Sequence, residues 1–327
     1  MRVGIDVSPL AQTRAGTARH LKGLLRELER RPDVEVRRFE FGGDRPPATV
    51  ARELAWYPLA LPRAARRAGV DVLHCPTYRG PLRDGPPLVV TVHDLAVFRH
   101  PDAFPPWTRT YSRLVVPLVA RTARCVIAVS EFTRREVVEL LRVPEERVRV
   151  VPNAVDDEFR PDGPAAEGDY VLAVGTLEPR KNLERVGEAA RRAGVELRVV
   201  GARGWGGVSA NGSGVRWLGE LPDEELARLY RGALCLAYPS LYEGFGIPIL
   251  EAMACGAPVV TSLGGATEEV AGGAAVLVDP LDPAAIASGI EEAAARRDEL
   301  RRLGLERMRF TWPEVAAATV EVYREAA

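Results

Sequence analysis

Short apolar runs rich in β-branched residues alternate with helical patterns along the whole chain, and this alternation leaves few folds open. A strand, a helix and a further strand in series favour a parallel sheet with helices packed on both of its faces. The pattern restarts after the segment PDGPAAEGD at residues 161–169, which is rich in Pro, Gly and acidic residues. Two such series predict an α/β protein built from two Rossmann-like domains, with parallel sheets facing a central cleft.

Six strands are expected in each series. In the first they are Val3–Val7, Val34–Phe41, Val72–His74, Leu88–Val92, Cys125–Val129 and Val148–Val151, with helices at His20–Arg30, Trp107–Thr122 and Glu131–Leu141. In the second they are Tyr170–Val174, Leu197–Val200, Val215–Leu218, Ala233–Ala237, Pro258–Thr261 and Ala275–Val278, with helices at Asn182–Arg192, Asp223–Arg231, Ile249–Cys255, Thr267–Ala271, Pro283–Arg296 and Trp312–Ala326.

Composition limits the partners. The chain has 327 residues, a length suited to two domains, and its net charge of −1 gives no sign of a nucleic-acid partner. Residues 1–163 carry 27 Lys and Arg against 21 Asp and Glu, whereas the remainder carries 17 against 24. A basic first half favours an anionic partner such as a lipid diphosphate or a membrane surface, although scattered surface arginine is the simpler interpretation.

The opening stretch and the cysteines indicate the compartment. MRVGIDVSPL reads as a strand and lacks the order of a signal peptide, and no apolar run reaches the length of a membrane span. The four cysteines are widely spaced and form no CxxC, which favours reduced thiols in the core over disulfides or zinc. We therefore expect a cytoplasmic protein, at most peripheral at the inner face of the membrane.

One stretch, PSLYEGFGIPILEAMACGAPVV at 239–260, carries the strongest chemical signal. Pro248 suits the first turn of a helix, and we expect Glu251 in that same turn. Unpaired N–H groups at such a helix start suit a phosphate, and Gly244 and Gly246 allow the backbone to approach a ligand. The alternative is that Glu251 only complements the helix dipole and that Glu243 is a solvated loop residue. A dehydrogenase is disfavoured, because DVSPLAQTRAG follows the first strand in place of GxGxxG.

The pattern E-G-F-G-x-P-x-x-E-A-M-A-C-G-x-P-V-V resembles the signature of retaining glycosyltransferases of family 4, which have the GT-B fold. The likeness continues through TVHDL (91–95), AVSEFTRREV (128–137), VPNAVD (151–156), VGTLEPRKNL (174–183), LGELPDEELARLY (218–230) and LVDPLDPAAIA (277–287). LEPRKN followed by VGARGW is most similar to the bacterial mannosyltransferase-like branch. The resemblance implies an acceptor domain at 1–163, a donor domain at 164–311, and a helix at 312–327 that packs back on the first domain.

The implied activity is transfer of a hexose, with mannose as the first guess, from a nucleotide-diphosphate sugar to a saccharide or lipid-linked acceptor. Such enzymes serve cell-envelope or polysaccharide biosynthesis. GDP-mannose is the first donor to consider and UDP-sugars follow. Two alternatives stay open: another GT-B nucleotide-sugar enzyme, such as an epimerase, or a non-catalytic nucleotide-sugar-binding protein.

The resemblance also implies roles for single residues. Lys181 and Arg180 would stabilise the charge that builds on the leaving diphosphate. The family's Arg directly after the strand's Gly is Thr176 here, so Arg180 takes its place in this prediction. The alternative without a functional role is that both cations are solvated surface charges. Glu243 would contact sugar hydroxyls, and Glu251 would accept hydrogen bonds from the ribose.

The remaining expected contacts come from both halves. The N–H groups of Gly244, Phe245 and Gly246 would face the sugar or its phosphates, and Leu221 would read the nucleobase. From the first half, Gly16 would approach the diphosphate with Arg14 beside it. His93 would reach the donor sugar, and His74 would line the acceptor cleft. His20 and His100 are taken as structural. The pair Asp156–Asp157 is also taken as structural. No metal and no cofactor are expected. In this family, cationic side chains and the start of a helix stabilise the diphosphate in place of a divalent metal.

Overall fold

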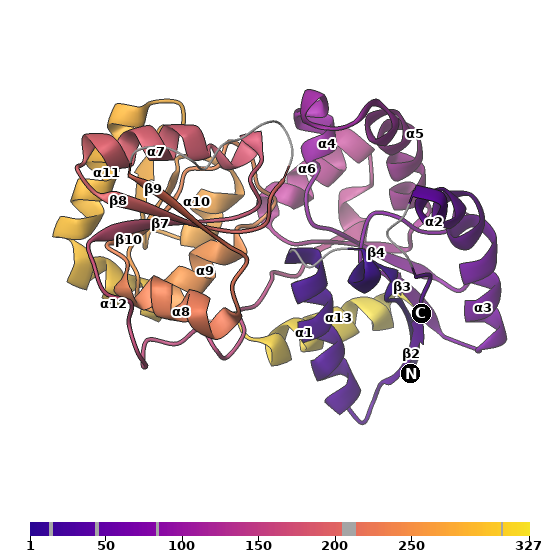
Figure 1. The fold of residues 1–327 in the computed structure, drawn as a ribbon. Coiled ribbons are helices and arrows are strands. Elements are labelled where there is room, and N and C mark those ends of the chain that lie inside the picture. Colours follow the sequence, from indigo (N-terminus) through magenta and orange to yellow (C-terminus); the bar gives the residue numbers. More distant parts are fainter. Residues whose placement is uncertain (13–15, 43–45, 83–84, 205–213, 309) are drawn as a thin grey trace. The chain divides into compact units, whose positions relative to one another are not determined.

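The computed structural model describes residues 1–12, 16–42, 46–82, 85–204, 214–308 and 310–327 (Figure 1). Within these residues the chain forms two compact units, one of residues 1–154 and 310–327 and one of residues 155–309. This division comes before the predicted boundary at 163/164. Residues 155–163 belong to the second unit. Arg231 of that unit donates to the carbonyl of Arg160 over 3.1 Å, and the ring of Phe159 packs on Tyr230.

The first unit is built on a six-stranded sheet of order β2-β1-β3-β4-β5-β6, and every pair in it is parallel. Its strands are β1 (Arg2–Asp6), β2 (Glu35–Phe39), β3 (Val72–Cys75), β4 (Leu88–Val92), β5 (Cys125–Ala128) and β6 (Val148–Val150). Strands β3, β4 and β5 are buried throughout, which is why they read as unbroken apolar runs.

Helices cover both faces of this sheet. On one face α1 (Gly16–Arg30) packs with α13 (Trp312–Ala326), and the two share a core with β1. On the other lie α3 (Leu61–Arg67), α5 (Pro106–Thr122) and α6 (Glu131–Leu141). The last helix of the chain thus belongs to the first unit. Shorter elements complete the unit: η1 (Ser8–Ala11), α2 (Pro46–Ala51), the π-helical η2 (Arg52–Ala60), α4 (Ala96–Arg99), η3 (Pro101–Ala103) and η4 (Glu145–Arg147).

The second unit repeats this plan with a parallel sheet of order β12-β11-β10-β7-β8-β9. Its strands are β7 (Tyr170–Val174), β8 (Glu196–Val200), β9 (Val215–Gly219), β10 (Cys235–Tyr238), β11 (Val259–Ser262) and β12 (Val276–Val278). Figure 1 shows α7 (Leu183–Arg192) and α11 (Pro283–Ala295) over one face of this sheet. The other helices are α8 (Asp223–Gly232), α9 (Ile247–Ala254), α10 (Gly265–Ala271) and α12 (Arg297–Arg307), and η5 (Pro179–Lys181) follows β7.

The predicted α/β class with two Rossmann-like parallel sheets is confirmed. Helices α2, η2 and α3 were not predicted, and Pro58 and Pro62 interrupt this segment. Helix α12 was not predicted either, because its buried residues are only Leu300 and Gly304 and no apolar stripe marks the helix. None of the helices in the described parts of the chain is long and apolar enough to span a membrane.

Candidate functional site

The candidate site lies where the second sheet reverses its strand order. Strands β7 and β10 are hydrogen-bonded neighbours, yet the chain passes from β7 to β8 and β9 on one side before it returns to β10 on the other. The loops that leave the carboxyl ends of two such strands diverge, and ligands of open α/β sheets bind at this point. The two loops here are residues 175–182 and 239–246.

The loop after β7 is held rigidly by Asn182. This residue adopts a left-handed conformation with φ of 60°, and its side-chain amide donates to the carbonyls of Pro239 (3.0 Å) and Pro280 (2.6 Å). Asn is one of the residue types that tolerate this conformation. The backbone N–H of Leu241 donates to the carbonyl of Arg180 over 2.8 Å. These bonds join the two loops and fix Arg180 and Lys181 beside the second one.

The loop after β10 is anchored from β11. Thr261 donates its hydroxyl to the carbonyl of Tyr238 over 3.0 Å, and Ser262 donates to the carbonyl of Ser240 over 2.6 Å. Both hydroxyls are buried, so each satisfies a backbone group that water does not reach. Glu243 therefore projects from a loop that is tied to β11 on one side and to the loop after β7 on the other.

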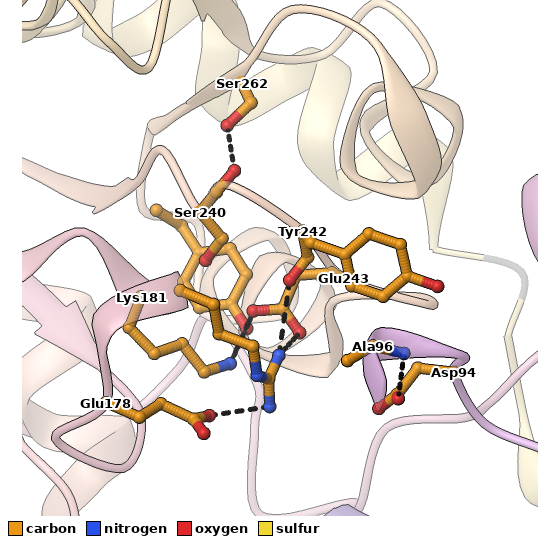
Figure 2. A network of polar contacts seen from close by, with 10 residues as sticks. Asp94, Ala96, Glu178, Lys181, Ser240, Tyr242, Glu243 and Ser262 are labelled. Carbon is orange, nitrogen blue, oxygen red and sulfur yellow. Dashed lines mark hydrogen bonds and ion pairs between the residues drawn. The ribbon is translucent and has the colours of Figure 1, made fainter. Parts of the chain in front are cut away.

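Figure 2 shows the polar network around Glu243. One carboxylate oxygen, Oε1, accepts hydrogen bonds from Lys181 Nζ at 2.5 Å and from the hydroxyl of Tyr238 at 2.9 Å. The other, Oε2, accepts from Arg180 Nη1 at 2.8 Å. The side chains of Glu243 and Lys181 are 9% and 10% exposed. The structure thus brings together three of the four residues predicted to be catalytic. The alternative that these residues are solvated surface charges is wrong, because their side chains are largely buried.

The network sets the charge of its members. Burial alone would raise the pKa of Glu243, but the charges of Lys181 and Arg180 and the hydrogen bonds it accepts hold that pKa at about 2. Burial lowers the pKa of Lys181, and Glu243 opposes this shift. Burial also raises the pKa of the Tyr238 hydroxyl well above its usual value. Glu243 is therefore a firmly ionised carboxylate and a weak base.

A second buried carboxylate, Glu178, holds the far side of Arg180. Its Oε1 atom lies 2.7 Å from Arg180 Nη2, and its side chain is 3% exposed. Burial raises the pKa of Glu178, and the charge of Arg180 works against that shift. Arg180 thus forms ion pairs with both Glu178 and Glu243, and these two contacts fix the direction of its guanidinium. Glu178 and Tyr238 were not predicted as site residues, although Glu178 lies within the LEPRKN segment.

The start of α9 differs from the prediction. Gly246 precedes the helix with φ of 111°, and α9 begins at Ile247, two residues before the predicted start. Glu251 consequently lies in the second turn, and the expectation that it lies in the first turn is wrong. Its buried carboxylate accepts a hydrogen bond from the hydroxyl of Tyr230 of α8 over 2.8 Å. Gly244 and Phe245 lie on the Glu243 loop as expected, and Phe245 is buried.

His93 belongs to the first unit, just after β4, and is half-buried. Its Nε2 atom lies 3.1 Å from the carbonyl of Pro76, which makes Nε2 the protonated nitrogen. Burial lowers the pKa of His93, so the ring is neutral near pH 7. The rings of His93 and His20 meet edge to face with their centroids 5.0 Å apart, and Nδ1 of His20 lies 2.8 Å from the side-chain oxygen of Asn153. His20 is buried.

His74 does not line an open surface. It is fully buried between the hydroxyls of Tyr323 (2.7 Å) and Thr91 (2.9 Å), where it connects α13 to the sheet. Gly16 is the exposed first residue of α1. Arg14 lies outside the described residues. Leu221 is half-buried in the second unit between the edge strand β9 and α8.

Within the described ranges, no group of three or more His, Cys, Asp or Glu side chains is placed to hold a metal ion. The candidate site instead pairs two cations with two carboxylates. A ligand carrying several phosphate charges could draw both cations toward itself, since the guanidinium binds phosphate through paired hydrogen bonds and the ammonium acts as a point charge.

Comparison with known proteins places both units in one family. Residues 14–159 match the family model described as Glycosyltransferase Family 4, and residues 155–306 match Glycosyl transferases group 1. O-antigen chain mannosyltransferase B of Escherichia coli is 32% identical over 72% of this chain and 70% of its own length. An MMP α-(1→4)-mannosyltransferase of Mycolicibacterium hassiacum is 31% identical over 80% of this chain and 72% of its own length.

Solved structures agree with the architecture. A sucrose-phosphate synthase from Thermosynechococcus elongatus superposes with a TM-score of 0.79 at 21% identity, covering 99% of this chain and 98% of its own. The Anabaena protein HepE, solved with UDP and glucose, superposes with a TM-score of 0.74 at 20% identity, covering 99% of each chain. These likenesses concern the fold, which is that of the GT-B glycosyltransferases.

Proposed function

Because the chain belongs to glycosyltransferase family 4, we propose that it transfers a hexose from a nucleotide-diphosphate sugar to a saccharide or lipid-linked acceptor, with retention of the anomeric configuration. Mannose from GDP-mannose is the first candidate, supported by the mannosyltransferases among its relatives. UDP-sugars are the second, supported by the neighbour that holds UDP-glucose. The acceptor would belong to cell-envelope or polysaccharide biosynthesis in the cytoplasm.

The observation that carries this proposal is the cluster of Lys181, Arg180 and Glu243 at the switch point of the second sheet. Breaking the bond between the sugar and the diphosphate builds negative charge on the leaving phosphate. Two fixed, desolvated cations stabilise that charge more in the transition state than in the ground state, which lowers the barrier. The same two cations would make a divalent metal unnecessary.

Glu243 fits a positioning role better than the role of a general acid. A carboxylate whose pKa is held at about 2 does not deliver a proton near neutral pH. In the proposed reaction the bond from the sugar carbon to the phosphate breaks, the acceptor oxygen bonds to the same face, and the acceptor proton passes to the leaving phosphate. Glu243 would bind sugar hydroxyls while it keeps Lys181 and Arg180 in place.

The other predicted contacts remain part of the proposal. Glu251 would bind the ribose, Gly244, Phe245 and Gly246 the sugar or its phosphates, and Leu221 the base. Their support is their place on the loop after β10, on α9 and at the end of β9. His93 and Gly16 would contribute from the first unit, which would bind the acceptor.

Donor binding tests the proposal directly. Calorimetry in EDTA with GDP-mannose, UDP-glucose, UDP-N-acetylglucosamine and dTDP-glucose should identify one tight ligand, and that binding should weaken in Glu251→Ala.

Lys181→Met should then lower turnover on that donor by about a hundredfold or more. Lys22→Met is the matched control, because Lys22 is the other lysine and lies exposed on α1. NMR of the product should show the donor's anomeric configuration. Failure of every nucleotide sugar to bind would overturn the assignment.

A further inference from the structure

Tyr238 is the last residue of β10 and lies where that strand leads into the loop that carries Glu243. Its hydroxyl oxygen is 2.7 Å from Lys181 Nζ and 2.9 Å from Oε1 of Glu243. Nζ and Oε1 are themselves 2.5 Å apart (Figure 2). The three polar atoms therefore form a closed triangle of hydrogen bonds, and all three side chains are largely buried.

The direction of each bond in this triangle follows from the groups that make it. A tyrosine hydroxyl has one proton to donate, and an ammonium group has no lone pair that could accept it. Burial and the charge of Glu243 raise the pKa of Tyr238 well above its usual value, so the hydroxyl keeps its proton. Tyr238 therefore donates to Glu243 and accepts from Lys181.

The triangle uses two of the three protons of the Lys181 ammonium. One is donated to Tyr238 and one to Glu243. The three N–H bonds of an ammonium group are arranged tetrahedrally about the nitrogen, so two fixed directions also fix the third. The remaining N–H is thus aimed at one place, where it can donate to a further acceptor.

A single partner would not give this precision. The lysine side chain is a flexible four-carbon stem with a rotating head, and one hydrogen bond to Glu243 would leave the ammonium free to turn about that bond. Tyr238 supplies the second bond. The stem is confined as well, because it runs past Gly175: a methyl group there would lie 3.1 Å from Cε of Lys181.

We propose that Tyr238 is a positioning residue of the transfer reaction, whose hydroxyl aims the third N–H of Lys181 at the leaving phosphate. This inference rests on the proposed function, in which Lys181 receives that phosphate. The negative charge on the phosphate grows as the bond to the sugar breaks, so a correctly aimed N–H stabilises the transition state more than the bound donor. Tyr238 acts through Lys181, and its loss should slow turnover more than it weakens donor binding.

Tyr238→Phe tests the proposal, because it removes one oxygen atom and keeps the ring, whose centroid lies 4.9 Å from Lys181 Nζ. The readout is release of GDP from GDP-mannose, or of UDP from UDP-glucose, according to which donor binds in calorimetry. We expect kcat at saturating donor to fall by about tenfold or more, while the Kd of the donor changes by less than about threefold.

Tyr170→Phe is the matched control. Tyr170 is also fully buried in the second unit, and its hydroxyl donates to the carbonyl of Leu229 over 2.6 Å. Both variants lose one buried hydrogen bond, so thermal unfolding should shift similarly, but Tyr170→Phe should keep the wild-type kcat. In Lys181→Met, the further change Tyr238→Phe should have little effect on kcat, because the group it positions is gone.

The outcomes separate this inference from the proposed function. A wild-type kcat in Tyr238→Phe, with Lys181→Met slowed, would overturn the inference and leave the proposed function standing. A wild-type kcat in Lys181→Met would overturn both. Equal losses of kcat in Tyr238→Phe and Tyr170→Phe would overturn the inference alone, because the hydroxyl would then act only through stability.

Discussion

The ammonium group of Lys181 lies 2.5 Å from one carboxylate oxygen of Glu243. The cation proposed to receive the donor phosphate is therefore paired with a carboxylate of its own site. Arg180 is held in the same way, between Glu243 and Glu178. The arrangement keeps two buried cations in position without leaving either charge uncompensated, which would be strongly unfavourable away from water.

Glu243→Gln should separate turnover from product binding. The amide keeps the size of the side chain and removes its charge, so Lys181 and Arg180 would attract phosphate more strongly. The nucleoside diphosphate of the preferred donor should bind as tightly as in wild type or up to about tenfold more tightly. Turnover should fall about a hundredfold, because the sugar and both cations lose their fixed geometry.

Calorimetry with the nucleoside diphosphate and initial rates with the whole donor give the two readouts. Glu188→Gln is the control, because Glu188 pairs with Arg192 on the exposed side of α7. Wild-type rates in Glu243→Gln would show that the charge of this carboxylate is not needed for turnover.

Glu178→Gln should act through Arg180. Without the charge of Glu178, the guanidinium loses one of the two carboxylates that set its direction. We expect kcat/KM for the donor to fall by roughly tenfold to a hundredfold, and less in Glu178→Asp. In Arg180→Ala the further change Glu178→Gln should have little effect, since the group it positions is gone. Additive losses in the double variant would contradict this role.

The stability of the second unit should depend on Glu243 at acid pH. The pKa of this carboxyl is about 2 in the folded protein against 4.5 as the ordinary value. Below pH 4.5 the unfolded chain binds a proton that the folded chain does not, so stability falls as the pH falls toward 2. The full contribution near neutral pH is about 3 kcal/mol, and about 2 kcal/mol of it is lost by pH 3. Urea unfolding at pH 6 and pH 3 measures this loss, and Glu243→Gln should show a smaller one. Parallel losses in both proteins would refute the assignment.

The strands could be predicted because of where they lie. A parallel strand buried on both faces must be apolar along its whole length, as in Leu88–Val92, so no period is needed to detect it. The segment from Arg52 to Arg67 could not be predicted in this way. Pro58 and Pro62 interrupt its pattern, and the π-helical turns of η2 follow a spacing that no α-helical template matches.

The site was predictable in its parts and not in its contacts. Glycines and acids around Glu243 indicated a ligand loop, and two adjacent cations indicated a phosphate. The pairing of Glu178 with Arg180 depends on how the loop after β7 folds over the end of β10, which local patterns do not encode. The position of Glu251 in α9 was wrong by part of a turn, because Pro248 follows the true first residue of the helix, Ile247.

Gly23→Ala should loosen the last helix from the first unit. A methyl group at Gly23 of α1 would lie 2.2 Å from the ring of Trp312 of α13, so the ring or the helix must move. Such overpacking destabilises a protein by about 1–3 kcal/mol.

Gly187→Ala in α7 is the matched control: its methyl group meets Val215 at an ordinary 3.6 Å, and alanine should stabilise that helix by about 0.5–1 kcal/mol. Thermal unfolding followed by tryptophan fluorescence should therefore move in opposite directions for the two variants. Donor binding should persist in Gly23→Ala, since Lys181 and Glu243 lie in the second unit, and a shift of the same sign in both variants would mean that Trp312 does not hold α13 on α1.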